Sequence, residues 1–224
     1  MVNRHDAPGR RSVTNDQVQW AGDQPIQSIS YVASIYQPMP STTVTTFYLE
    51  MTDPAALRPA MTHPANFTTV RAEIASPELN RFLYTAVGGN WYWLNRLGWS
   101  YARWQSYLDR PDLETWVGYL AGTPAGYFEL ERQDDGSVEI AYFGLLPAFI
   151  GRGLGGPLLT AAIRRGWAMG AQRVWVHTCS LDGPAALANY EARGLRRYKV
   201  EHATTELPDS APGPWPGAHD SATK

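Results

Sequence analysis

The sequence has little cysteine, little excess charge of either sign and no long apolar run. Cys179 is the single cysteine in 224 residues, which excludes an internal disulfide and a cysteine-based zinc cluster. Lysine and arginine (19) nearly balance aspartate and glutamate (21), so charge gives no reason to expect a nucleic-acid partner. No apolar run approaches the roughly 20 residues of a membrane helix, and the polar N-terminus lacks the apolar stretch of a secretory signal. We therefore expect a cytoplasmic protein with neither nucleic acid nor a membrane as its partner.

Composition divides the chain into an arm, a domain and a tail. Residues 1–40 are polar and show no sustained periodicity, which predicts a flexible N-terminal arm with a short strand at 29–32 at most. Residues 208–224 are rich in proline and predict an extended tail. The stretch 41–207 between them carries most of the apolar and aromatic residues, and we expect it to form one domain.

Within the domain, strand patterns and helix patterns follow one another. Ser76 and Pro77 are typical of a helix start, and Gly88 and Gly89 of its end. The other expected helices are Ser100–Leu108, Leu154–Met169 and Pro184–Ala192; the expected strands are Thr42–Met51, Thr115–Leu120, Ala125–Glu131, Val138–Leu146, Arg173–Cys179 and Arg196–Glu206. Short turns join the middle strands into an antiparallel meander, whereas a strand, a helix and a strand after residue 138 predict a parallel pair. The fold class is therefore α/β, with a mixed, mostly antiparallel central sheet flanked by helices.

The end of the domain leaves room for one final strand before Pro208. We expect the open edge to be completed either by a partner subunit, as in a homodimer, or by the N-terminal arm.

A glycine-rich turn connects the meander to the helix that follows it. The glycines at 151, 153, 155 and 156 let the backbone approach a ligand closely, and the first amides of the helix favour an anion. Many such loops bind nothing, so spacing alone leaves phosphate binding undecided. The loop lacks the Gly-Lys-Ser/Thr ending of a P-loop, and no first strand of a dinucleotide-binding repeat precedes it.

Two motifs in this order resemble a known family. Leu-Leu-Pro followed by Gly151-Arg152-Gly153-Leu154-Gly155 is similar to motif A of the GNAT N-acetyltransferases, and Asn189-Tyr190-Glu191-Ala192-Arg193-Gly194-Leu195 is similar to the Tyr-Glu-Lys-x-Gly-Phe helix end of that superfamily. The resemblance covers roughly residues 42–206.

The resemblance implies a GNAT-type fold, acetyl-CoA as cosubstrate and no metal. It further implies that the amides of Gly151, Arg152, Gly153, Leu154, Gly155 and Gly156 hold the pyrophosphate of coenzyme A. Leu145 would offer backbone hydrogen bonds to the pantetheine arm or the acetyl carbonyl. Ile150 stands where the family usually has Arg or Gln, and Pro157 removes one amide donor from the first helical turn.

Acetyl transfer to an amine needs a base, donors for the oxyanion and an acid for the departing thiolate. The resemblance places Tyr190 near the sulfur, as the acid. Alternation along the strand puts Glu139 on one face with Ala141, Phe143 and Leu145, which favours it as the base, and the resemblance also places a glutamate base there. Glu129, His177 and a water molecule remain alternatives for the base; Tyr190 and Glu139 are alternatively structural residues.

The resemblance also implies that the segment before the meander lines the acceptor pocket. Among its many aromatic residues we expect Trp91 or Trp93 to bind substrate and about half of the others to pack in the core. The sequence thus predicts an N-acetyltransferase that acts on a primary amine of an unknown small molecule or peptide. The alternatives are a non-catalytic CoA-binding or regulatory module and an unrelated phosphate-binding α/β protein.

Overall fold

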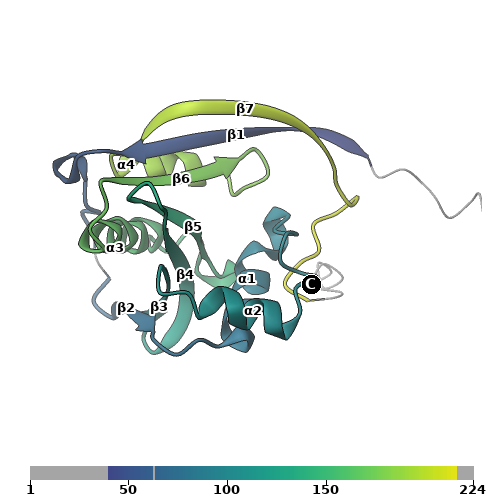
Figure 1. Ribbon diagram of the computed structural model, residues 1–224, viewed down its shortest axis with the longest axis horizontal. Coiled ribbons are helices and arrows are strands. Elements are labelled where there is room, and N and C mark those ends of the chain that lie inside the picture. Colours follow the sequence, from purple (N-terminus) through teal and green to yellow (C-terminus); the bar gives the residue numbers. More distant parts are fainter. Residues whose placement is uncertain (1–39, 63, 216–224) are drawn as a thin grey trace, which may run out of the picture. The chain divides into compact units, whose positions relative to one another are not determined.

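A seven-stranded sheet forms the centre of the computed structural model, which describes residues 40–62 and 64–215 (Figure 1). The strands lie in the order β2-β3-β4-β5-β6-β1-β7. Their bounds are β1 (Ser41–Met51), β2 (Phe67–Ala72), β3 (Leu113–Leu120), β4 (Thr123–Arg132), β5 (Ser137–Leu145), β6 (Arg173–Cys179) and β7 (Arg196–Glu206). β5 and β6 run parallel, and the other neighbouring strands are antiparallel. The expected α/β fold with a mixed, mostly antiparallel sheet is confirmed. The N-terminal arm, including the strand expected at 29–32, and residues 216–224 lie outside the described residues.

Helices cover both faces of the sheet. They are α1 (Pro77–Gly88), α2 (Tyr101–Leu108), α3 (Gly155–Ala168) and α4 (Ala186–Ala192), with 3₁₀ helices η1 (Pro54–Ala56), η2 (Gly89–Trp91) and η3 (Pro147–Phe149). Tyr127 and Phe128 are neighbours on β4 and are both fully buried. Tyr127 packs with Leu83 of α1, whereas Phe128 packs with Leu158 of α3, so the two helices cover opposite faces. Within the described ranges, no helix is long and apolar enough to cross a membrane.

Serine side chains cap both α1 and α2, although the sequence analysis predicted only the α1 cap. The Ser76 hydroxyl accepts a hydrogen bond from the Leu79 amide (3.3 Å), and the Ser100 hydroxyl accepts one from the Arg103 amide (3.2 Å).

Gly88 and Gly89 do end α1, although neither adopts a left-handed backbone, with φ of −88° and −57°. A side chain on Gly88 would collide with the Trp93 ring, and one on Gly89 would collide with the backbone of Gly213. Close packing, rather than backbone freedom, therefore requires glycine at both positions.

β2 is a strand that the sequence did not predict. It pairs with β3 from Phe67 opposite Leu120 to Ala72 opposite Thr115. Phe67 is its one fully buried residue, so the short edge strand shows little of the apolar alternation that marks a strand in a sequence.

β1, the first described strand, lies between the last two strands of the chain. Tyr48 is opposite His177 of β6 on one side and Lys199 of β7 on the other. β1 is therefore an interior strand, which the sequence predicted over Thr42–Met51 without indicating its neighbours. β7 forms one edge of the described sheet, and completion of that edge by a partner subunit or the N-terminal arm stays a prediction.

A β-bulge in β5 changes which residues share a face. Glu129 lies opposite Tyr142 and Leu130 lies opposite Ile140, so Ala141 has no partner on β4. The extra residue reverses the alternation, because Ile140 packs toward α3 and Tyr142 packs toward α1. Glu139 therefore faces away from the side that Phe143 and Leu145 occupy, and the expectation that these residues share a face was wrong.

Candidate active site

A cavity of about 750 Å³ opens where β5 and β6 separate. The two strands pair only from Ser137 opposite Arg173 to Glu139 opposite Trp175. Beyond this point the edge of β5 that faces β6 keeps unpaired backbone groups, up to Leu145. The lining residues come from both faces of the sheet, so the cavity connects the α3/α4 side with the α1/α2 side.

The glycine-rich loop borders the cavity on the α3/α4 side. Gly151 and Gly153 have φ of 80° and 75°, a left-handed conformation that disfavours any other residue. α3 then begins without a side-chain cap, which leaves the amides of Gly155 and Gly156 without a partner inside the helix. These amides and the positive end of the helix dipole form a site suited to an anion.

Tyr190 of α4 lines the cavity on the same side. Its side chain is 5% exposed, and its ring lies 5.9 Å from that of Phe143 in an edge-to-face arrangement. Burial raises the pKa of the Tyr190 phenol well above its usual value, so the phenol stays protonated at neutral pH.

His177 lines the cavity on the opposite face and is supported by Glu139. The imidazole Nδ1 lies 3.1 Å from a carboxylate oxygen of Glu139, whose second oxygen accepts a hydrogen bond from Gln133 (3.1 Å). Glu139 itself is not among the residues that line the cavity. The hydrogen bond to Glu139 raises the pKa of His177 above its usual 6.5. The structure thus places two of the expected base candidates, His177 and Glu139, in contact with each other. Of the two, His177 is the one that lines the cavity.

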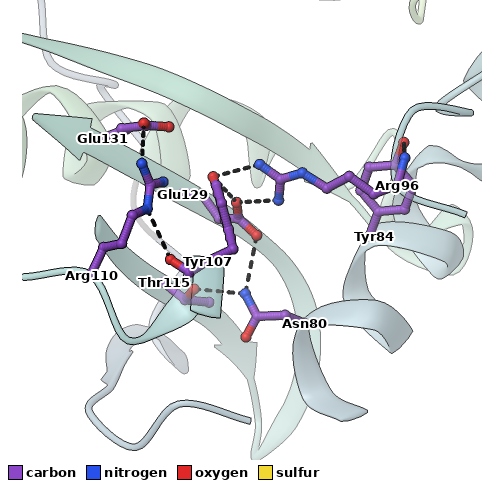
Figure 2. A network of polar contacts seen from close by, with 8 residues as sticks. All are labelled: Asn80, Tyr84, Arg96, Tyr107, Arg110, Thr115, Glu129 and Glu131. Atoms are coloured by element: carbon purple, nitrogen blue, oxygen red, sulfur yellow. Dashed lines mark hydrogen bonds and ion pairs between the residues drawn. The ribbon is translucent and has the colours of Figure 1, made fainter. Parts of the chain in front are cut away.

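Glu129, another candidate base, belongs to a buried network of hydrogen bonds and ion pairs (Figure 2). Its carboxylate is fully buried and lies 2.7 Å from the Arg96 guanidinium. Asn80 (3.0 Å) and the Tyr107 hydroxyl (3.1 Å) donate further hydrogen bonds to it. Because this carboxylate is bound by three donors and does not line the cavity, it is not placed to take a proton from a substrate there.

Aromatic side chains form the wall on the α1/α2 side. Trp91 and Trp93 both line the cavity, as does Tyr142, whose ring lies 4.9 Å from that of Trp93. Trp99 and Trp104 instead pack around the guanidinium of Arg96, at 4.9 and 5.5 Å. The aromatic segment therefore divides between the cavity wall and the surroundings of Arg96, while Tyr101 is exposed.

Residues 80–195 match the family model described as the acetyltransferase (GNAT) family. The chain belongs to the GNAT acetyltransferase family.

Solved structures share this fold at low sequence identity. A GCN5-related N-acetyltransferase from Kribbella flavida is 18% identical with a TM-score of 0.52, covering 81% of this chain and 65% of its own. One from Sphaerobacter thermophilus is 15% identical with a TM-score of 0.55, covering 84% of this chain and 60% of its own. An aminoglycoside acetyltransferase from an uncultured soil metagenomic sample is 17% identical with a TM-score of 0.54, covering 64% of this chain and 98% of its own. The chain thus spans less than two thirds of the first two proteins. No curated protein sequence matches the chain significantly.

Arg193 is a functional candidate that the sequence analysis did not single out in this GNAT chain. It follows α4 and lines the cavity, and a side chain on Gly156 would collide with its guanidinium. Its buried Nε has no hydrogen-bond partner among the described residues. A cation with unused donors therefore lies beside the free amides of the glycine loop. Its place within the second GNAT motif is the one signal in the sequence by which it could have been found.

Asp182 is a second candidate that sequence reasoning missed. It lies between β6 and α4 and is the one carboxylate among the described residues that line the cavity. One of its oxygens accepts hydrogen bonds from the Thr178 hydroxyl (2.7 Å) and the Cys179 amide (2.9 Å). No motif marks such a loop aspartate, so only the tertiary structure brings it to the cavity.

Proposed function

We propose that this chain is an N-acetyltransferase that transfers the acetyl group of acetyl-CoA to a primary amine by direct attack. One observation carries the proposal: a single cavity joins an anion-binding glycine loop to an aromatic-walled space through the gap between β5 and β6. A donor that enters from the α3/α4 side would meet there an acceptor that enters from the other face. Membership of the GNAT family supports the same reaction.

The donor side suits coenzyme A. The free amides of Gly155 and Gly156 and the guanidinium of Arg193 can hold a pyrophosphate. The unpaired edge of β5, up to Leu145, offers backbone groups to the amides of the pantetheine arm, as an added strand would use them. The side chain of Ile150 brings no donor to the loop, whereas Arg193 adds a positive charge beside it.

We assign the proton transfers to residues on either side of the gap. Nδ1 of His177 is engaged by Glu139, so Nε2 is free to take the proton of the incoming ammonium. Glu139 is then a positioning residue rather than the base. The amine forms the new C–N bond as the thioester C–S bond breaks, and Tyr190 gives its proton to the departing thiolate. The second proton of the amine returns to Tyr190, which leaves an amide, a free thiol and one proton on His177.

Calorimetric titration with acetyl-CoA tests the donor site directly. The chain should bind acetyl-CoA, and Gly153→Val should abolish binding because valine disfavours the left-handed backbone of the loop. Gly122→Val is a matched control, since Gly122 has φ of 81° in the exposed β3–β4 turn and open space for a side chain. It should cost comparable stability and leave the affinity unchanged.

Thiol release with a panel of primary amines then tests turnover. Binding of acetyl-CoA without acetylation of any amine would support the non-catalytic CoA-binding module instead. A folded chain that does not bind acetyl-CoA would refute both.

A further inference from the structure

The acceptor half of the cavity has rigid aromatic walls. The Trp93 ring is fixed between the rings of Tyr142 (4.9 Å) and Tyr84 (5.5 Å) and against the bare backbone of Gly88. Trp91 lies on the neighbouring part of the wall, beside Gly183. A flat apolar group can bury its surface between such rings, and their faces also attract a cation.

Asp182 places one negative charge at this wall. Its Oδ2 takes the hydrogen bonds from Thr178 and Cys179, whereas the one contact of Oδ1 within the described part of the chain is a 3.5 Å hydrogen bond from the indole nitrogen of Trp93. Oδ1 therefore keeps lone pairs for a ligand, while the other contacts hold the carboxylate in place. Asp182 lines the same cavity as His177 and Tyr190, and its negative charge helps to raise the pKa values of both.

The rest of the acceptor wall offers few polar groups. Besides Asp182 and His177, its polar groups are the Asn95 amide and the hydroxyls of Tyr84, Tyr92 and Tyr142, and the remaining lining, including Val87 and Leu181, is mainly apolar. A ligand with many hydroxyl or amino groups would lose hydrogen bonds to water without regaining them here. A single ammonium on an apolar body would instead find one carboxylate and several ring faces.

We propose that the acceptor is an arylalkyl primary amine, and that Asp182 binds its ammonium while Trp91, Trp93 and Tyr142 enclose its aromatic group. This inference rests on the proposed acetyltransferase function. Asp182 attracts the protonated amine to the gap between β5 and β6, where His177 then takes its proton.

Steady-state acetylation by the full chain tests this substrate class. We expect a higher kcat/KM for 2-phenylethylamine than for ethylamine, spermidine or kanamycin. Asp182→Asn keeps an oxygen for the Thr178 and Cys179 hydrogen bonds but removes the charge. It should raise the KM for 2-phenylethylamine by about 10- to 100-fold, the effect of losing a charged hydrogen bond, with the KM for acetyl-CoA unchanged.

Two comparisons separate charge recognition from a structural role. The neutral analogue 2-phenylethanol should inhibit wild type and Asp182→Asn with the same inhibition constant, because it has no charge to lose. Asp134→Asn, which removes an exposed carboxylate in the β4–β5 turn, should change neither KM. Equal weakening of 2-phenylethylamine and 2-phenylethanol by Asp182→Asn would overturn the proposal and make Asp182 a support of the loop.

The two proposals fail in different ways. Preferred acetylation of spermidine or kanamycin would overturn the substrate class and leave the acetyltransferase function intact. Absence of acetyl-CoA binding by the folded chain would overturn the acetyltransferase function itself.

Discussion

The buried ion pair between Arg96 and Glu129 gives the most direct test of how the acceptor wall is supported. The two side chains are 5% and 0% exposed and lie 2.7 Å apart. Glu129→Gln leaves the guanidinium buried without a counter-charge, although the rings of Tyr107 and Tyr142 lie about it at 4.0 and 4.1 Å. Removing one partner of a buried pair costs about 3–5 kcal/mol, because the remaining charge stays desolvated. This is a large fraction of the roughly 5–15 kcal/mol that stabilises a typical domain.

Glu131→Gln is a matched control on the same strand and the same face. Glu131 pairs with Arg110 at the same 2.7 Å, but the two side chains are 23% and 38% exposed. Solvent screens this pair, so its loss should cost less than about 1 kcal/mol.

Urea unfolding at constant pH measures both free energies of unfolding. Glu129→Gln should lower the midpoint strongly and leave the slope unchanged, and Glu131→Gln should shift it little. The double variant with Arg96→Met and Glu129→Leu should recover much of the loss, since no charge then stays buried. The reasoning is refuted if the two single variants lose the same stability. Because Arg96 contacts the Tyr142 ring, Glu129→Gln should also raise the KM for the amine more than the KM for acetyl-CoA.

Three further perturbations test the His177–Glu139 pair, Tyr190 as the acid and the packing at the end of α1. kcat/KM for the amine should rise with pH through the pKa of His177, which lies above 6.5. Glu139→Gln should lower that pKa in the pH–rate profile. An unchanged profile would contradict the assignment of His177 as the base. The His177–Glu139 pair should stabilise the fold below pH 6.5, and this stability should be lost as the pH rises through the raised pKa of His177. Urea unfolding midpoints measured across this pH range can follow the loss. Tyr190→Phe should reduce kcat by about 100-fold or more in single-turnover assays while acetyl-CoA still binds, and full activity would exclude it as the acid. Gly89→Ala should cost about 1–3 kcal/mol in thermal unfolding, because a methyl group would collide with the backbone of the C-terminal tail, whereas Gly98→Ala, which has open space, should cost little.

Features that depend on residues close together in the sequence could be predicted from it. Ser76 caps its own helix, and Gly151 and Gly153 adopt a backbone that their own lack of a side chain permits. The glycine loop was therefore found, together with the helix that it opens. The strands of the meander were found for the same reason, since their turns and their alternation are local.

Features that depend on pairing between distant strands could not be predicted. The bulge at Ala141 exists only because β4 pairs with β5 in a shifted register, and it reversed the face expected for Glu139. The position of Asp182 at the aromatic wall likewise follows from tertiary packing of a loop. The acid role of Tyr190 and the substrate roles of Trp91 and Trp93 stay predictions, and the base role first expected of Glu139 passes to His177 in the proposed mechanism.

The position of β1 has a consequence for how the chain folds. A ribosome makes Ser41–Met51 before any other described strand, yet its two neighbours, β6 and β7, are among the last segments to be made. Until then this β-branched and aromatic segment has both backbone edges unpaired, which is the state in which strands associate with other chains. Its native contacts also join residues far apart in sequence, and contacts of this kind slow folding. During synthesis β1 can pair only after β6 has been made, so this segment is open to association with other chains for most of that time.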